Sequence, residues 1–169
     1  WRDSALAVLD QLTQGPQILV GSSMGGWIAL LVALARPERI AGIVGVAAAP
    51  DFTEEFIWEK LTAEGKNKVM NEGIIYEPSA YNTQPYTITK QLIEDGRRHL
   101  LLQKEIAVDV PVRLLQGLQD PDVPWQHSIR IAEKLRTQDV RVDLIKAGDH
   151  RLVREQDLIL LKNTVKDLM

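Results

Sequence analysis

Cysteine is absent from this 169-residue chain. Disulfides, a cysteine nucleophile and thiolate metal sites are therefore excluded. An excess of one charge is lacking too: the net charge is −3, with both signs interspersed, which gives no indication of a nucleic-acid partner or an anionic membrane surface. The apolar run after Ser23 is too short and interrupted to span a membrane. What remains is an ordinary globular composition, 45% hydrophobic and 25% charged, at a length that suits one domain.

The most informative stretch is ILVGSSMGGWIALLVALA, at residues 18–35. A short β-branched run ends in a cluster of small residues, and a helix-favouring apolar run follows. A strand, a sharp turn and a helix are the setting that a G-x-S-x-G nucleophile elbow requires. We expect glycine to be needed at positions 21 and 25, because a side chain there would prevent the strand and the helix from approaching each other.

In such an elbow Ser23 projects its hydroxyl from the carboxyl end of the strand. The first N–H groups of the following helix face the same point and favour a developing oxyanion. A glycine-rich turn with a buried serine, or a phosphate-binding turn, is the alternative interpretation.

The rest of the chain alternates between strand and helix patterns. We predict helices at residues 1–12, 23–36, 125–136 and 152–169, with Asp3 or Ser4 capping the first, and strands at residues 17–21, 39–49, 111–117 and 140–147. This alternation predicts an α/β fold with a parallel sheet flanked by helices.

Residues 51–108 differ, because they are richer in charge and aromatic side chains. Helical patterns occur there at 53–64, 66–72 and 89–102. We interpret the segment as an insertion over the sheet edge, within one domain that spans residues 1–169.

A serine nucleophile needs an imidazole to take its proton and a carboxylate to orient that imidazole. In a parallel sheet such residues lie on the loops that leave the strand carboxyl ends. Asp120 follows the strand at 111–117 and His150 follows the strand at 140–147, so Ser23, Asp120 and His150 each come after a separate strand.

Other residues compete for these two roles. Of the three histidines, His99 is expected on a solvated helix face and His127 at a surface or capping position. Asp122 is the alternative acid, although it could instead serve the turn before Val123. Asp149 adjoins the histidine in sequence and is poorly placed to reach its ring.

These motifs resemble those of the α/β-hydrolase superfamily. GSSMGG matches its elbow, GLQDPDVPW matches its G-x-x-D-x-x-V-P acid loop, and GDH matches its histidine loop. The resemblance extends through the whole chain. The most similar branch is that of the mitochondrial palmitoyl-protein thioesterases and acyl-glucuronide esterases, with its bacterial relatives, on the stretches GSSMGGWIAL, ARPERIAGIVGVAAA and PVRLLQGLQDPDVPWQHS.

The resemblance implies hydrolysis of acyl esters or thioesters through an acyl-enzyme, with no cofactor and no metal. It assigns Ser23 as nucleophile, His150 as base, Asp120 as the orienting acid, and the N–H of Met24 as one oxyanion donor. The substrates implied are small-molecule or protein-linked acyl groups. The location implied is the cytoplasm of a bacterium or the mitochondrion of a eukaryote.

One departure from the family concerns the start of the chain. Full α/β hydrolases have several strands before the elbow, and one of their loops donates a second oxyanion N–H. Here a single helix precedes the elbow strand, so we expect this chain to be the C-terminal part of a longer protein whose N-terminal strands are missing.

In this family an insertion such as 51–108 would be a cap. We predict that Phe56, Trp58, Met70 and Tyr76 line an apolar acyl pocket there, and the alternative is that they form the cap's own core. Two other functions stay open, namely a serine peptidase of the same fold and a non-catalytic, hydrolase-like binding module.

Overall fold

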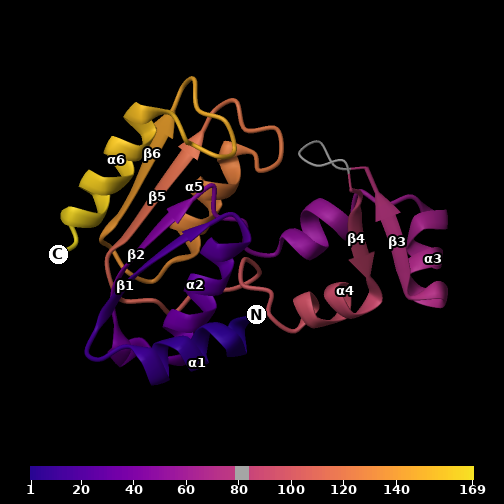
Figure 1. The fold of residues 1–169 in the computed structure, drawn as a ribbon, viewed down its shortest axis with the longest axis horizontal. Coiled ribbons are helices and arrows are strands. Elements are labelled where there is room, and N and C mark those ends of the chain that lie inside the picture. Colours follow the sequence, from indigo (N-terminus) through magenta and orange to yellow (C-terminus); the bar gives the residue numbers. More distant parts are fainter. Residues whose placement is uncertain (79–83) are drawn as a thin grey trace. The chain divides into compact units, whose positions relative to one another are not determined.

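The computed structural model describes residues 1–78 and 84–169 (Figure 1). The chain divides into two compact units. Residues 1–50 and 101–169 form the first unit, and residues 51–100 form the second. The second unit covers most of the segment 51–108 that we interpret as an insertion, whereas residues 101–108 belong to the first unit. The role of this segment as a cap stays a prediction.

The first unit is built on a four-stranded sheet in the order β1-β2-β5-β6. Its strands are β1 (Gln17–Ser22), β2 (Ile40–Val46), β5 (Val112–Gly117) and β6 (Val140–Ile145). All neighbouring pairs are parallel, which confirms the predicted α/β sheet. The two central strands are buried almost throughout, as their continuous apolar sequences predict.

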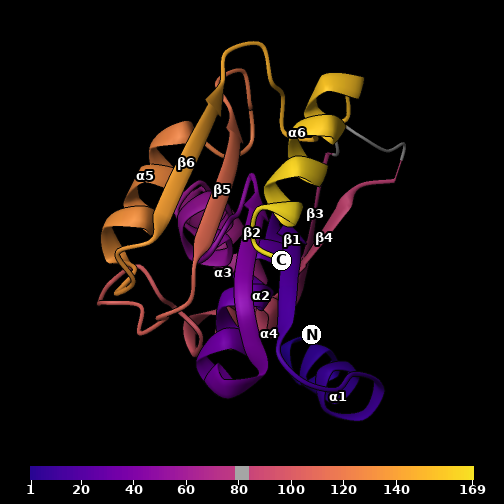
Figure 2. The same cartoon turned by 90° about the vertical axis from the view of Figure 1, so that its left-hand side faces the viewer.

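Four α-helices connect and cover these strands, namely α1 (Arg2–Leu12), α2 (Met24–Ala35), α5 (Trp125–Lys134) and α6 (Glu155–Lys166). A short 3₁₀ turn (Pro37–Arg39) leads into β2. Helix α2 packs on β1 and β2, and α5 packs on β5 and β6. Helices α5 and α6 lie on opposite faces of the sheet (Figure 2). The predicted caps Asp3 and Ser4 were wrong, because the helix already begins at Arg2 with Trp1 at the N-cap position.

The two faces of the sheet have different partners. Val46 and Leu115 form a cluster with Leu152, against which Leu160 and Leu161 of α6 pack. Alternate residues along a strand point to opposite faces, so Leu114 and Gln116 of β5 point the other way. Gln116 therefore faces the side covered by α5, with no exposed surface.

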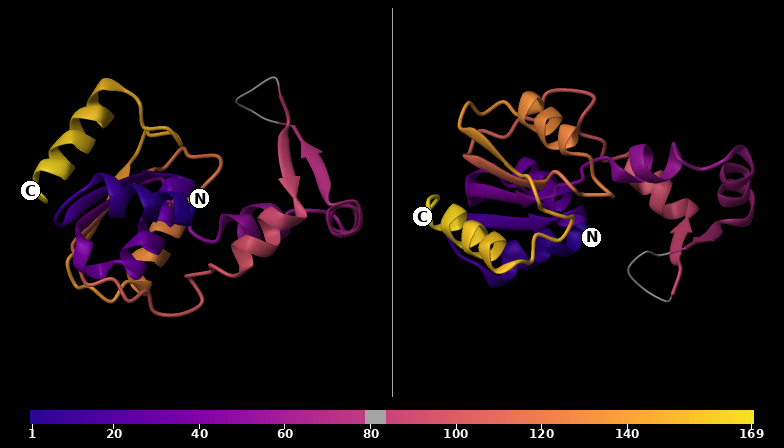
Figure 3. Two further views of the ribbon diagram at one scale, coloured as in Figure 1. Left: turned by 60° about the horizontal axis from the view of Figure 1, so that its bottom comes forward. Right: turned by 90° about the horizontal axis from the view of Figure 1, so that it is seen from above.

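The second unit contains helices where the patterns at 66–72 and 89–102 predict them, and two strands that the sequence pattern did not predict. It consists of the π-helical segment η2 (Thr53–Trp58), α3 (Ala63–Glu72), β3 (Ile74–Glu77), β4 (Tyr86–Thr89) and α4 (Lys90–Arg97). Strands β3 and β4 pair in antiparallel fashion (Figure 3). The helix expected at 53–64 is correct only in its first half, because the π-helical segment ends at Trp58. Thr62 adopts an extended conformation and caps α3 by accepting the N–H of Gly65.

Candidate active site

Ser23 occupies the turn between β1 and α2 with φ at +52° and ψ at −120°. Non-glycine residues rarely adopt a positive φ, so the surrounding contacts must hold it. The N–H of Ser23 donates to the Val46 carbonyl at 2.8 Å. Its own carbonyl accepts the N–H of Gly26 at 2.9 Å and that of Ala49 at 3.1 Å. The elbow is thus held by β2 on one side and by the first turn of α2 on the other.

Two glycines allow this turn. A Cβ atom on Gly21 would lie 2.2 Å from the carbonyl oxygen of Gly25, and one on Gly26 would lie 2.5 Å from the Cβ atom of Ala48. A Cβ atom on Gly25 would meet nothing within 4 Å. The expectation of close approach was right for Gly21 and wrong for Gly25, because Gly26 is the helix residue that faces the neighbouring strand connection.

Asp120 follows β5, and its side chain is fully buried. Its Oδ1 atom accepts the N–H of Asp122 at 2.8 Å and that of Val123 at 2.9 Å. Its Oδ2 atom lies 2.8 Å from His150 Nδ1 and accepts from Gln116 Nε2 at 3.0 Å. Burial acts to raise the pKa of Asp120, but the hydrogen bonds with His150 and with the two loop N–H groups outweigh it, so the pKa lies below its ordinary value.

His150 lies on the loop after β6 and joins the other two residues. Its Nδ1 atom faces Asp120, and its Nε2 atom lies 3.1 Å from Ser23 Oγ. An ionised carboxylate only accepts hydrogen bonds, so Nδ1 carries the proton and Nε2 is left to accept the serine hydroxyl. The hydrogen bond to Asp120 is the largest cause that raises the pKa of His150, partly opposed by burial.

The loops that carry the acid and the histidine touch through their backbones. A Cβ atom on Gly117, at the end of β5, would lie 2.3 Å from the carbonyl oxygen of Gly148. This contact brings Asp120 and His150 within hydrogen-bonding reach, although 30 residues separate them in sequence.

The competing residues have other environments. Asp149 Oδ1 accepts the N–H groups of Arg151 and Leu152 within its own loop.

His127 is not at the surface as expected: it is 3% exposed, and its Nε2 atom lies 2.9 Å from the Pro50 carbonyl oxygen. The cause is amphipathic spacing, because His127 lies on the buried face of α5 together with Ser128 and Ile131. His99 is half-buried, with its Nε2 atom 4.0 Å from Asp95 Oδ1.

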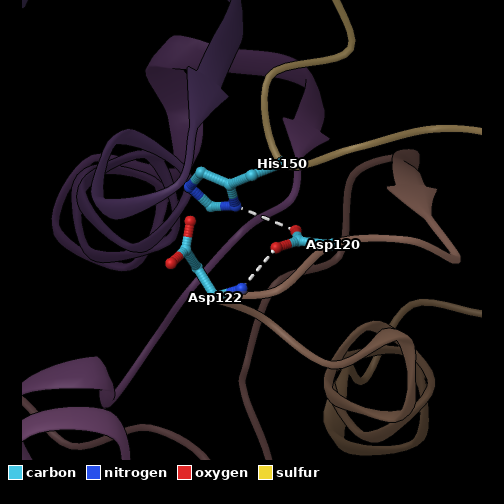
Figure 4. Close-up of side chains that lie close together, drawn as sticks. All are labelled: Asp120, Asp122 and His150. Carbon is cyan, nitrogen blue, oxygen red and sulfur yellow. Dashed lines mark hydrogen bonds and ion pairs between the residues drawn. The ribbon is translucent and has the colours of Figure 1, made fainter. Parts of the chain in front are cut away.

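Asp122 is close to the imidazole as well. Its carboxylate turns toward the ring of His150, while Asp120 faces Nδ1 (Figure 4). One ligand atom from each of Asp120, Asp122 and His150 lies within 4.8 Å of the others, which is close enough for the three groups to share a metal ion. A cation bound through Nδ1 and Asp120 Oδ2 would replace the hydrogen bond between these atoms, so it would compete with the arrangement described above.

The four predicted pocket residues lie in the second unit. Trp58 packs against the cluster of Val69, Ile75, Ile88 and Ile93. Its ring also lies beneath Arg97 at 4.5 Å and Lys66 at 5.5 Å. Phe56 is half-buried beneath Lys60, Met70 is half-buried, and Tyr76 is 63% exposed. A pocket-lining role for these residues stays a prediction, and for Trp58 the contacts favour the alternative of a core residue.

Sequence reasoning missed Gln116 and Ser128, which lie next to the acid. Ser128 Oγ donates to Gln116 Oε1 at 3.0 Å, and both side chains are buried. The available signal was a glutamine within the otherwise apolar end of the strand at 111–117.

Comparison with known proteins identifies the family. The sequence pattern of the α/β hydrolase fold matches residues 2–72. A crystal structure described as that of a hydrolase candidate, from Agrobacterium vitis S4, superposes with a TM-score of 0.95 at 40% identity, covering 99% of this chain and 67% of that one. The chain belongs to the α/β-hydrolase family.

A mammalian relative is similar over the same range. The mitochondrial palmitoyl-protein thioesterase ABHD10 of mouse is 41% identical over 172 residues, covering 100% of this chain and 57% of the relative. The structure of the mouse protein superposes with a TM-score of 0.90 at 40% identity, covering 99% and 67% of the two chains. This α/β hydrolase thus spans little more than half the length of the curated relatives that it matches. Within its described residues, none of its helices has the length and apolarity needed to cross a membrane.

Proposed function

We propose that this α/β hydrolase is a serine hydrolase that cleaves acyl esters or thioesters. The observation that carries the proposal is the hydrogen-bonded chain from Asp120 through His150 to Ser23. Nucleophile, base and orienting acid are the three groups that such catalysis needs, and here they come from three separate strand ends.

In the first step Ser23 Oγ attacks the acyl carbonyl carbon, and His150 Nε2 takes the hydroxyl proton. Asp120 keeps the proton on Nδ1 and stabilises the imidazolium that forms. The carbonyl oxygen becomes an oxyanion, and we assign the N–H of Met24 as its donor. Met24 is the first residue of α2, and the first N–H groups of a helix have no partner within that helix.

The tetrahedral adduct then collapses. His150 Nε2 donates its proton to the leaving sulfur or oxygen, and the acyl group stays on Ser23. A water molecule enters, gives a proton to Nε2 and attacks the acyl carbon, and Ser23 leaves with the proton returned from His150.

The substrate class rests on similarity. The mouse relative is named as a palmitoyl-protein thioesterase, which supports an acyl thioester, either protein-linked or small-molecule, as the substrate. The same name supports a mitochondrial location if the source is a eukaryote. A bacterial cytoplasmic location stays a prediction.

Labelling by a fluorophosphonate probe tests the proposal. The probe reacts with an activated serine, so we expect the chain to be labelled and the variants Ser23→Ala and His150→Ala to lose labelling. A folded chain whose labelling persists in Ser23→Ala, or that is not labelled at all, would contradict the proposal for this chain.

Relative rates on matched thioester, oxyester and amide substrates test the substrate class. We expect the thioester and the oxyester to be cleaved far faster than the amide. Preference for the amide would favour the peptidase, and binding of an acyl compound without turnover would favour the non-catalytic module.

A further inference from the structure

Gln116 is a polar side chain in a place where the fold provides apolar ones. It lies in β5, one of the two central strands, and is 0% exposed. A buried amide is costly unless its donors and its acceptor are bonded. The bonds of Gln116 therefore indicate what it does.

Each end of the amide has distinct partners. The Nε2 atom carries two hydrogens and faces three acceptors, namely Asp120 Oδ2 at 3.0 Å, the Val123 carbonyl at 3.1 Å and the Gly117 carbonyl at 3.2 Å. The Oε1 atom accepts the hydroxyl of Ser128 at 3.0 Å. If the amide were turned around, Oε1 would face three other acceptors, so the observed orientation is the one that satisfies both ends.

We propose that Gln116 is a positioning residue for the acid Asp120, and that Ser128 holds Gln116 in turn. The inference rests on the proposed function. It extends the site to one hydrogen-bonded chain of five side chains, from the buried face of α5 to the nucleophile: Ser128, Gln116, Asp120, His150 and Ser23.

The geometry explains why the acid needs this partner. The Oδ1 atom of Asp120 is fixed by two loop N–H groups. The Oδ2 atom would otherwise depend on His150 alone, and His150 itself must stay oriented toward Ser23. With Gln116 as a second donor, the plane of the carboxylate is set by groups that do not take part in proton transfer. The same amide ties the two ends of the acid loop together through the carbonyls of Gly117 and Val123.

The test compares Gln116→Met with Gln119→Met. Both substitutions make the same chemical change, but Gln119 is exposed in the acid loop. For Gln116→Met we expect kcat on an acyl thioester to fall about 10- to 100-fold, which is the rate equivalent of one hydrogen bond to a charged group. The value of KM should stay within about twofold, since Gln116 acts on the acid and not on the substrate. Gln119→Met should have the same kcat and KM as the unmodified protein.

A spectroscopic readout separates positioning from a merely structural role. The Nδ1 proton of His150, held against Asp120, should give a downfield proton NMR signal that is absent in His150→Gln. We expect this signal to broaden or disappear in Gln116→Met, at a temperature where the variant is fully folded. This measurement needs no turnover, so it tests the inference even if the proposed function fails.

Ser128→Ala is the gentler second variant. Alone, it should lower kcat by about threefold. Combined with Gln116→Met, it should lower kcat no further, because the two residues act as one unit. If Gln116→Met does not fold, the Nδ1 signal of Ser128→Ala tests the inference in its place. A folded variant with unchanged kcat and an unchanged Nδ1 signal would overturn the inference.

Discussion

The two units of the chain differ in what their half-buried and buried side chains contact. At the strand ends of the first unit, buried polar atoms bond to one another, as between Asp120 and His150. In the second unit, the aromatic ring of Trp58 is covered by its own unit, through the apolar cluster and two cations. Trp58 thus contributes to the core of its own unit, whereas the proposed chemistry depends on the bonded polar side chains of the first unit.

Replacing the acid should give the largest effect. In Asp120→Asn we expect kcat to fall about 10⁴-fold with the fold retained, because the amide no longer holds His150 with its proton on Nδ1. Steady-state kinetics and circular dichroism check both parts. Asp139→Asn removes a carboxylate that pairs with Arg113 away from the site and should leave kcat within about twofold. A comparable loss in both variants would mean that general electrostatics, and not orientation of His150, sets the rate.

The sequence predicted much of this site because its residues follow strand ends. Parallel strands place their carboxyl ends at one edge, so Ser23, Asp120 and His150 could be expected there before any coordinates. The role of Gln116 could not, because a single polar residue in an apolar strand does not indicate which partner it will meet across the fold. The burial of His127 was missed for another reason, since the buried face of α5 itself carries polar residues, His127 and Ser128.

The nucleophile elbow offers a comparison of two neighbouring glycines. We expect Gly21→Ala to destabilise the fold by about 3 kcal/mol or more, since its Cβ atom would overlap the Gly25 backbone. In Gly25→Ala the added Cβ atom has no neighbour within 4 Å. An alanine in the first turn of a helix should therefore be neutral or stabilising by up to about 1 kcal/mol. Denaturant unfolding measures both. Equal losses in the two variants would show that the elbow is not limited by this contact.

The second unit was predicted less well, for a local reason. Its strands β3 and β4 have four residues each, and short segments carry too little periodicity to distinguish a strand from a loop. Thr62 caps α3, and Thr89, the last residue of β4, caps α4, although the residue type alone does not show whether a threonine caps a helix or continues one.

Trp58 tests whether the second unit mainly maintains its own fold. We expect Trp58→Ala to destabilise the protein by about 2 kcal/mol, below the value for a fully buried tryptophan because the side chain is half-buried. The preference for acyl chain length should not change. Tyr76→Ala, at an exposed position, should stay within about 0.5 kcal/mol. An altered chain-length preference in a stable Trp58→Ala variant would instead support the predicted acyl pocket.

The smallest effect concerns the second carboxylate beside the histidine. The negative charges that act to raise the pKa of His150 are, in decreasing order, those of Asp120, Asp122 and Asp149. His150 must be neutral to accept the serine proton, so the rate rises with pH through its pKa. Asp122→Asn removes one raising charge, and the acidic limb of the profile of kcat/KM should therefore move to lower pH.

The maximum rate of Asp122→Asn should change by no more than about threefold, because the backbone N–H that holds Asp120 is retained. Asp3→Asn makes the same charge change on the exposed first turn of α1 and should leave the profile in place. A loss in Asp122→Asn as large as that in Asp120→Asn would assign the orienting role to Asp122, the alternative that the sequence left open. An unshifted profile with a normal rate would instead mean that solvent screens Asp122 from the imidazole.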